Sequence, residues 1–330
     1  MIRFYQKNKP FYEFSNFYSS PIVVDGKSFA TVEHYYQASK FKFRGATKEE
    51  LARFEYIRQL GTPLEAFREG RKKVKGLRID PNWDDMKDNV MRKGVFRKFV
   101  THEKLRNLLL STENKEIIED SPRDGYWGIM PKNGKPGLNM LGIILQEVRY
   151  LLSSSSVPQP VLSTKSHWII PRFLLSSAYP QSFDELKKVD VVVTLQEDKE
   201  LEKFRSYRKT EVKFNSSKRV DFVRAEKLYV RFSIPDRKST DDLILDAFTD
   251  CCARFISKKL RFLVHCFGGK GRTGLVVSII LGKVYGMNSK EALDIISRLF
   301  SLYRQDKGGK GPPSMPQTKE QYSSVRVLLG

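Results

Sequence analysis

Short apolar runs alternate with longer amphipathic stretches through the second half of the chain. The runs at 189–195, 228–232 and 262–264 are rich in valine, leucine and aromatic residues and too short for helices, which predicts buried strands. The stretches at 240–258 and 289–304 carry apolar residues at helical spacing and predict helices. Strands that alternate with helices are typical of a largely parallel sheet.

The first half has a different pattern, in which helices predominate. Thr31 is a predicted N-cap, because it precedes a helix-compatible stretch that runs to Phe41. The remaining predicted elements of this half are strands at 2–5 and 22–24, a turn at 25–26, and helices at about 84–99 and 102–110.

Residues 153–160 interrupt both patterns with four serines and two prolines. This composition is typical of a solvated connector. We therefore expect a first domain at 1–152, a linker at 153–160 and a second domain at 161–330. A length of 330 residues suits two domains.

The formal net charge of +21 is spread over both halves. It favours anionic partners, namely a phosphorylated protein or small molecule, a ribose phosphate, or an ADP-ribosylated nucleotide or nucleic acid. A merely solvated surface explains the same charge equally well. No apolar run reaches the roughly 18–20 residues of a membrane span, so we expect no membrane span.

The three cysteines cannot all pair, and Cys251 and Cys252 look like buried helix residues. A reactive thiol at Cys266 suits a reducing compartment, so we expect a cytoplasmic location, with the nucleus as the alternative. No cluster of His, Cys and Asp has the spacing of a metal site, so we expect no metal and no cofactor.

The stretch from Arg261 to Gly274 combines an apolar run with four glycines, and an apolar helix is predicted from Leu275. Such a loop points backbone N–H groups at an anion and adds the positive end of the helix. A cysteine held there near an arginine ionises readily, and the thiolate is the nucleophilic form. Arg272 lies six positions after Cys266, and its planar fork can grip two phosphate oxygens.

Two other interpretations of this loop fit the sequence poorly. A nucleoside-triphosphate loop would need Gly-Lys-Ser/Thr, whereas Lys270 is followed by Gly271. An ordinary turn between strand and helix needs neither Cys266 nor Arg272 at this spacing. The pattern of Cys, five residues and Arg-Thr-Gly resembles the protein-tyrosine phosphatase superfamily. The His before the Cys resembles its dual-specificity branch.

The resemblance covers roughly 160–330 and implies an α/β phosphatase domain with a central mixed sheet flanked by helices. It implies hydrolysis of phosphotyrosine, phosphoserine, phosphothreonine or another phosphorylated ligand through a phosphocysteine. Cys266, Arg272 and Thr273 become catalytic candidates. The implied phosphate-binding residues are Phe267, Gly268, Gly269, Lys270, Gly271 and Gln321.

Asp236 is the predicted general acid of this domain. It follows a predicted strand in the step Ile-Pro-Asp, which resembles the phosphatase general-acid loop. A departing alkoxide or phenoxide needs a positioned acid, and Pro235 stiffens the loop. An ordinary Pro-Asp turn is the alternative.

Glu33 is the candidate of the first half. It lies in the first turn of the helix predicted after Thr31, where a carboxylate can act as acid, base or nucleophile on a glycosidic carbon. The plainer interpretation is that Glu33 suits the positive end of a helix.

Several segments of the first half resemble the NADAR family and its riboflavin-intermediate N-glycosidases. The matching segments are Ser15–Tyr18, Thr31–Ala38, Lys40–Phe41, Trp83 with Met91, Tyr126–Gly128 and Gly137–Gly142. The resemblance implies a compact, helix-rich α+β domain that cleaves a C–N glycosidic bond on a ribose phosphate, with Glu33 as catalytic carboxylate. The implied pocket residues are Asn16, Phe17, Lys40, Trp83, Trp127 and Asn139.

One position departs from this family. The bacterial riboflavin-intermediate enzymes place an acidic residue after Trp-Gly, where this chain has Ile129, and the loop 130–134 carries no acid. The substrate therefore stays open between a ribose phosphate and ADP-ribosyl-guanine, which some family members cleave. Together the two halves predict a bifunctional hydrolase. The alternative is a basic nucleic-acid or polyphosphate binding protein with a passive first domain and a phosphatase acting on phosphoinositides or nucleotides.

Overall fold

The computed structural model describes residues 1–130, 135–154, 166–180, 186, 188–201, 211–213, 228–305 and 315–330. The chain divides into two compact units, Met1–Ser153 and Ser154–Gly330, each with its own buried apolar core. Residues 155–160 of the predicted linker and 131–134 of the loop after Ile129 lie outside the described residues.

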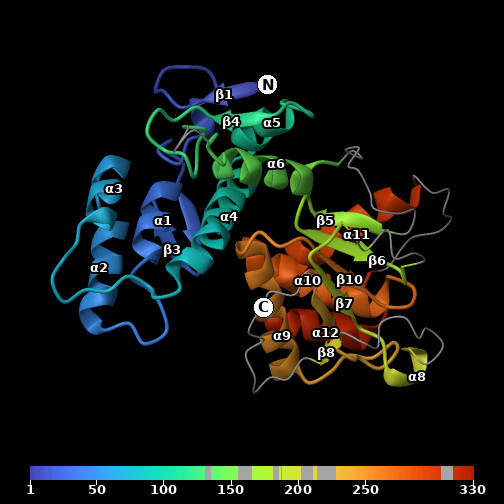
Figure 1. The fold of residues 1–330 in the computed structure, drawn as a ribbon. Helices are drawn as coiled ribbons and strands as arrows, with labels where there is room; N and C mark the ends of the chain where they lie inside the picture. Colours follow the sequence, from blue (N-terminus) through green and yellow to red (C-terminus); the bar gives the residue numbers. More distant parts are fainter. Residues whose placement is uncertain are drawn as a thin grey trace. The chain divides into compact units, whose positions relative to one another are not determined.

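Helices predominate in the first unit (Figure 1). Its elements are β1 (Ile2–Phe4), a 3-10 turn (Tyr12–Phe14), β2 (Ile22–Val24), β3 (Lys27–Phe29), α1 (Val32–Ser39), α2 (Lys48–Arg58), α3 (Pro63–Arg71), α4 (Trp83–Thr101), α5 (Glu103–Leu110), β4 (Ile117–Glu119) and α6 (Met140–Leu152). β1 and β4 pair in parallel, with Phe4 opposite Glu119. β2 and β3 form an antiparallel hairpin around the predicted turn at Asp25 and Gly26.

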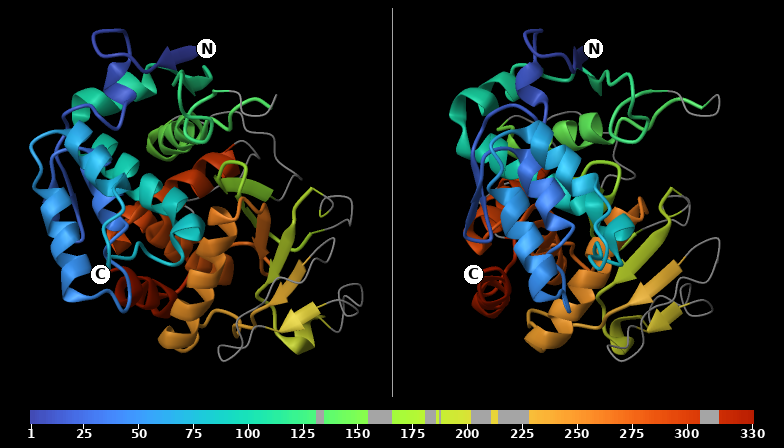
Figure 2. Two further views of the ribbon diagram at one scale, coloured as in Figure 1. Left: turned by 60° about the vertical axis from the view of Figure 1, so that its left-hand side comes forward. Right: turned by 90° about the vertical axis from the view of Figure 1, so that its left-hand side faces the viewer.

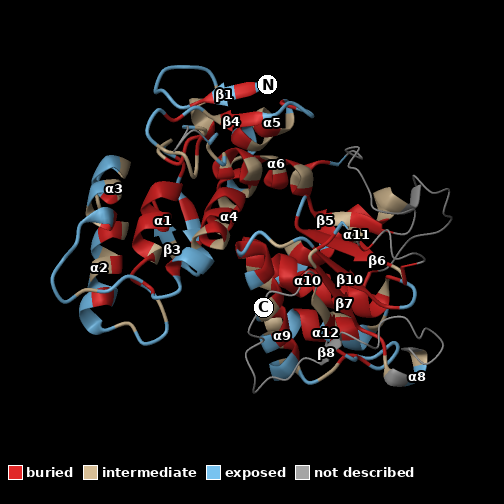
Figure 3. Cartoon of the chain, viewed as in Figure 1, coloured by how far each residue is buried: buried red, intermediate tan, exposed pale blue. Residues whose placement is uncertain are grey.

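α1 is the centre of this unit. Every residue from Val32 to Ala38 is buried, and α2, α3 and α4 pack around the helix (Figure 3). The Thr31 side chain accepts a hydrogen bond from the His34 backbone N–H at 3.3 Å, which confirms the predicted N-cap. Because α1 is enclosed, Glu33 in its first turn lies in the interior.

The apolar pattern does not predict α2 and α3, although each begins with a capping box. Thr47 and Glu50 form the box of α2, and Thr62 and Glu65 form that of α3. In α3 only Ala66 and Gly70 are buried, so the apolar stripe is too thin for periodicity to detect.

The second unit is built on one six-stranded sheet among the described residues (Figure 2). Its elements are β5 (Ser166–Ile170), β6 (Leu174–Ser177), β7 (Val191–Thr194), α8 (Asp198–Leu201), β8 (Glu211–Lys213), β9 (Leu228–Arg231), α9 (Asp242–Ser257), β10 (Phe262–His265), α10 (Gly271–Tyr285), α11 (Ser289–Gln305) and α12 (Lys319–Leu329). The strand order is β5-β6-β10-β7-β9-β8, and every pairing is parallel except that of β5 with β6.

β10 lies in the middle of this sheet, and all four of its residues are buried. α10 follows it and is buried along nearly its whole length, with α9, α11 and α12 packed around it. In open sheets with parallel strands, ligands bind outside the carboxyl ends of the strands. The fold therefore presents the loop between β10 and α10 as the place for a site.

The predicted strands at 189–195 and 228–232 and the helices at 240–258 and 289–304 are confirmed as β7, β9, α9 and α11. One boundary is wrong. The helix expected from Leu275 begins at Gly271, inside the predicted phosphate loop. Its first turn carries two glycines and a threonine, which hide the helix start from an apolar pattern.

Candidate active sites

The predicted nucleophile stands at the carboxyl end of β10. Cys266 follows the last residue of the strand and is buried. The chain then turns at Gly269, whose φ is 67°. A Cβ at Gly269 would lie 2.5 Å from the backbone nitrogen of Ala178 and 2.7 Å from the carbonyl of Ser177. Only glycine fits both the positive φ and the small space beside Ser177 and Ala178. The loop therefore passes close to the end of β6.

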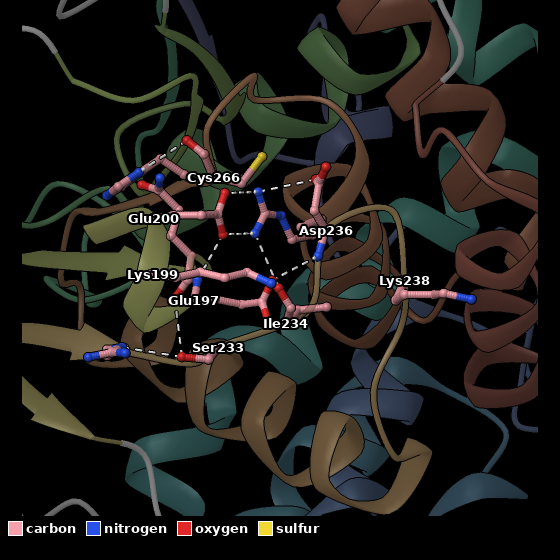
Figure 4. Close-up of polar contacts among 12 residues, drawn as sticks. Glu197, Lys199, Glu200, Ser233, Ile234, Asp236, Lys238 and Cys266 are labelled. Carbon is pink, nitrogen blue, oxygen red and sulfur yellow. Dashed lines mark hydrogen bonds and ion pairs between the residues drawn. The ribbon is translucent and has the colours of Figure 1, made fainter. Parts of the chain in front are cut away.

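Arg272 lies in the first turn of α10 and is 2% exposed. Its Nη1 donates to Glu200 Oε2 at 2.6 Å and to the Ile234 carbonyl at 3.2 Å, and its Nη2 donates to Glu200 Oε1 at 2.8 Å. Figure 4 shows these contacts, with Cys266 close by. Among the described residues, the Nε–H of Arg272 has no hydrogen-bond partner. One edge of the guanidinium is therefore fixed while another remains available.

Glu200 is a residue that sequence reasoning missed. It lies on α8, just after β7, and β7 is the strand beside β10. Burial opposes its charge, but the hydrogen bonds and charge of Arg272, the Glu197 backbone N–H and the charge of Lys199 together hold the pKa of Glu200 below its usual value. The feature that could have identified Glu200 is its position just beyond the carboxyl end of β7, the strand beside β10 in the sheet.

Asp236, the predicted general acid, reaches the same guanidinium. It stands in the loop after β9, with Oδ1 3.3 Å from Arg272 Nη2, and its side chain is 65% exposed. Burial opposes the charge of Arg272, but Glu200, Cys266 and Asp236 together raise the pKa of Arg272 above its usual value. The fold thus assembles Cys266, Arg272 and Asp236 from three segments.

The other predicted phosphate-site residues have varied surroundings. Thr273 is fully buried, and its hydroxyl has no partner among the described residues. Phe267 is 61% exposed, Gly268 has open space around it, and Lys270 is partly buried.

Gln321 lies against the loop, because a Cβ on Gly271 would come within 3.2 Å of its amide. Both the nitrogen and the oxygen of that amide form hydrogen bonds. Its Nε2 donates to the Lys238 carbonyl, and its Oε1 accepts from the backbone of Gln317 and Thr318 at the start of α12.

The first unit contains a pocket of about 420 Å³. Its lining residues are Tyr5, Ser15, Asn16, Phe17, Glu33, Tyr36, Gln37, Lys40, Leu64, Phe67, Arg71, Met91, Glu119, Ser121, Arg123, Asp124 and Trp127. They come from α1, α3 and α4, from the segment after β1, and from the segment that begins at the end of β4.

Glu33 is 5% exposed in this pocket. Its Oε1 accepts a hydrogen bond from Gln37 Nε2 at 2.7 Å, and Gln37 Oε1 accepts one from Lys40 Nζ at 2.5 Å. Burial raises the pKa of Glu33 to about 7, against the hydrogen bond from Gln37 and the charge of Lys40, which both lower it. Glu33 is therefore able to gain or lose a proton near neutral pH.

Lys40 links α1 to α3. Its Nζ also donates to the Gly70 carbonyl at 3.0 Å, and it lies near the rings of Tyr36 and Trp83. Burial lowers the pKa of Lys40 to about 8, partly offset by Glu33.

The predicted pocket residues divide into two groups. Asn16, Phe17, Lys40 and Trp127 line the pocket together with Glu33. Asn16 Nδ2 donates to Met91 Sδ at 3.3 Å, while its buried Oδ1 has no partner among the described residues.

Trp83 and Asn139 do not line the pocket. Trp83 packs behind it against Tyr36, with ring centres 5.1 Å apart. Asn139 precedes α6, and its side chain accepts from the Glu119 backbone N–H and donates to the Ile117 carbonyl, at 3.0 and 2.9 Å. Asn139 therefore holds β4 in place.

Two pocket carboxyl groups escaped the sequence analysis, Glu119 at the end of β4 and Asp124 in the following turn. Asp124 Oδ1 accepts from the backbone N–H groups of Tyr126 and Trp127 at 2.7 and 2.8 Å. No local pattern marks them. Only the pairing of β4 with β1 and the turn toward α6 bring them to Glu33.

Within the described ranges, no three His, Cys, Asp or Glu side chains are grouped so as to hold a metal ion. None of the described helices is both long and apolar enough to cross a membrane.

Comparison with known proteins assigns the two units to different families. Residues 3–153 match the NADAR domain, and residues 163–308 match the Swiss Army Knife protein, DSP-PTPase phosphatase domain. N-glycosidase YbiA of Escherichia coli K12 is 42% identical over 156 residues, which cover 46% of this chain and 89% of YbiA. N-glycosidase Npun_R5314 of Nostoc punctiforme is 39% identical over 160 residues, which cover 47% and 97%.

Two solved structures also align. The NMR structure of E. coli YbiA covers 46% of this chain and 83% of its own at 38% identity, with a TM-score of 0.40. The crystal structure of Tk-PTP in the active form covers 50% and 95% at 22% identity, with a TM-score of 0.36. Since the N-terminal match spans most of each N-glycosidase, the chain belongs to the NADAR family, and it is a two-domain hydrolase in which a NADAR domain is fused to a DSP-type phosphatase domain.

Proposed function

We propose that the C-terminal domain hydrolyses phosphomonoesters through a covalent phosphocysteine. The Cys266 thiolate attacks phosphorus, while the loop N–H groups and the Nε–H edge of Arg272 bind the phosphoryl oxygens. The arrangement of Arg272 carries this proposal. Glu200 fixes one edge of its fork, and the unpartnered Nε–H is left for a ligand.

Asp236 protonates the leaving oxygen in this scheme. Its exposed side chain, 3.3 Å from Arg272 Nη2, stands beside the place where a bound phosphate would lie. After the ester oxygen leaves with that proton, the Asp236 carboxylate takes a proton from the water that releases phosphate from Cys266. The bonds of Gln321 favour a role in supporting the loop over a role in placing this water.

In our proposal the phosphorylated ligand carries a second anionic group beyond the phosphate that is hydrolysed. Lys270 lies in the phosphate loop and is partly buried. Lys199 and Lys238 already pair with Glu197 and Glu320, and Figure 4 shows the Lys238 side chain extending away from Asp236. A multiply phosphorylated protein segment, phosphoinositide or nucleotide would offer Lys270 a further phosphate.

The test is hydrolysis of p-nitrophenyl phosphate by Cys266→Ser. A hydroxyl is a far weaker nucleophile than a thiolate, so we expect turnover to fall by at least about 10³-fold. Cys251→Ser, on α9, is the matched control and should keep wild-type turnover. Turnover by Cys266→Ser within tenfold of wild type would reject Cys266 as the nucleophile.

We further propose that the N-terminal domain cleaves the N-glycosidic bond of a ribose phosphate or ADP-ribosyl-guanine. Glu33 acts as the base that activates water for attack on the ribosyl carbon, since its carboxyl group is buried in the pocket and titrates near neutrality. Trp127 and Phe17 offer ring faces to a base. Arg71 and Arg123 offer positive charge to phosphates at the same pocket.

Release of ADP-ribose from an ADP-ribosyl-guanine oligonucleotide, and of free base from a ribosylaminopyrimidine phosphate, tests this second activity. We expect Glu33→Gln to lower the rate by about 10²–10⁴-fold, the usual loss for a missing general base. Glu116→Gln, an exposed site before β4, is the matched control. Equal release by wild type and Glu33→Gln would reject Glu33 as the general base. Salt-dependent nucleic-acid binding without glycosidase turnover would support the binding protein with a passive first domain instead.

A further inference from the structure

We propose that Glu119 is the second acid of the N-terminal site and protonates the base as it leaves. The inference rests on the proposed N-glycosidase function and adds the group that this reaction otherwise lacks. A base that departs from a ribosyl carbon as an anion is a poor leaving group, so an acid beside it speeds the step.

The position of Glu119 supports this role. It ends β4, which pairs with β1, and its backbone N–H bonds to Asn139 Oδ1, so the residue has a fixed place in the fold. Its side chain lines the pocket that holds Glu33. Among the described residues, its Oε2 is shielded from solvent and has no hydrogen-bond partner. Such an atom is expected to meet a polar group of the ligand.

Glu119 also lies beside the position where the chain lacks an acid. The Ile129 backbone N–H donates to the Glu119 carbonyl at 3.2 Å, so the two residues are neighbours although ten positions separate them. The pocket therefore has a carboxyl group next to Ile129 that does not come from the loop after Trp127.

The charges around Glu119 favour its neutral, proton-carrying form. Burial, together with the charges of Asp124 and Glu33, raises its pKa to about 8. At neutral pH Glu119 thus holds its proton while Glu33 is about half ionised. The titratable and charged groups that share the pocket with Glu119 are Tyr5, Glu33, Tyr36, Lys40, Arg71, Arg123 and Asp124.

In the proposed step the C–N bond breaks, and its electron pair goes to the base, which takes the proton of Glu119. Water adds its oxygen to the ribosyl carbon and passes a proton to Glu33. Solvent then returns a proton to Glu119 and removes one from Glu33, so the net reaction is hydrolysis.

The pH dependence of kcat/KM tests the assignment on the full-length protein with the ADP-ribosyl-guanine oligonucleotide. In wild type we expect activity to rise as Glu33 ionises near pH 7 and to fall as Glu119 loses its proton near pH 8. Glu119→Gln replaces a neutral acid by a neutral amide of the same shape. We expect it to lower kcat by about 10²-fold or more and to abolish the basic limb.

Glu119→Gln with a rate within threefold of wild type overturns the proposal that Glu119 is the acid. A basic limb that persists in Glu119→Gln also overturns it, because the limb then belongs to Lys40. Glu119→Asp keeps an acid on a shorter side chain, so it should retain the basic limb at reduced rate, and its loss of that limb would count against Glu119 even if Glu119→Gln folded poorly. A wild type that releases no ADP-ribose from the oligonucleotide is a different failure, that of the proposed function itself.

Discussion

At the scale of single residues, the two candidate sites shift the pKa values of their carboxyl groups in opposite directions. Glu33 and Glu119 are enclosed in a pocket where burial dominates, so both carboxyl groups hold protons more tightly than in water. Glu200 contacts the Arg272 guanidinium, and that contact, with the Glu197 backbone N–H and the charge of Lys199, holds the pKa of Glu200 below its usual value despite burial. The first environment suits proton transfer, and the second suits a fixed electrostatic cradle.

Glu200 is a positioning residue by this argument, because it touches Arg272 and not the reacting atoms. Glu200→Gln removes the charge that holds both Nη atoms of Arg272. We expect kcat/KM for p-nitrophenyl phosphate to fall by about tenfold, the order of one charge-assisted hydrogen bond. The affinity for inorganic phosphate should weaken in parallel.

The control for that change is Asp294→Asn on the exposed side of α11, which should keep wild-type kinetics. An increase in phosphate affinity in Glu200→Gln would show that Glu200 competes with the ligand for Arg272, and would contradict the positioning role.

At the scale of elements, the N-terminal site depends on the close approach of α3 to α1. Gly70 gives α3 a surface without a side chain, and Lys40 reaches across to its carbonyl. The same contact holds Lys40 against Gln37, which in turn faces Glu33. The close contact between α1 and α3 thus orients the Glu33 carboxyl group in the pocket.

Gly70→Ala tests this contact. A Cβ there would lie 2.3 Å from Gln37 Oε1 and 2.6 Å from Gln37 Cβ, so the helices would have to separate. We expect the free energy of unfolding in urea to fall by about 1–3 kcal/mol from overpacking. The helix propensity gained over glycine, at most about 1 kcal/mol, offsets only part of this loss.

The matched control is Gly61→Ala, before α3, where a Cβ would meet only Glu65 Oε2 at an ordinary 3.6 Å. That variant should unfold at the wild-type urea concentration. Unchanged stability and unchanged base release in Gly70→Ala would mean that α3 is free to move away from α1 at no cost.

At the scale of the whole molecule, each unit carries its own core and its own site. The groups proposed for phosphate chemistry all lie in Ser154–Gly330, and those proposed for glycosidic chemistry all lie in Met1–Ser153. Cys266→Ser and Glu33→Gln therefore serve as controls for one another, since each leaves the residues of the other site in place. The net charge of +21 suits the anionic ligands proposed for both sites.

The sequence alone predicted the features that depend on neighbours along the chain. The apolar run before Cys266, the glycines after it and the six-residue step to Arg272 lie within one short stretch, so their order already describes a strand, a glycine-rich turn and a helix. Thr31 likewise acts within its own helix. The families followed from the same local motifs.

Tertiary structure decided which distant residues meet. Glu200 joins Arg272 because β7 lies beside β10 in the sheet, and Glu119 joins Glu33 because β4 returns to pair with β1. It also determined that Trp127 lines the pocket whereas Trp83 packs behind Tyr36, a difference that no local pattern around either tryptophan shows. Hydrophobic period and motif spacing report on contacts within a few residues, whereas these contacts depend on the order of strands and the approach of helices.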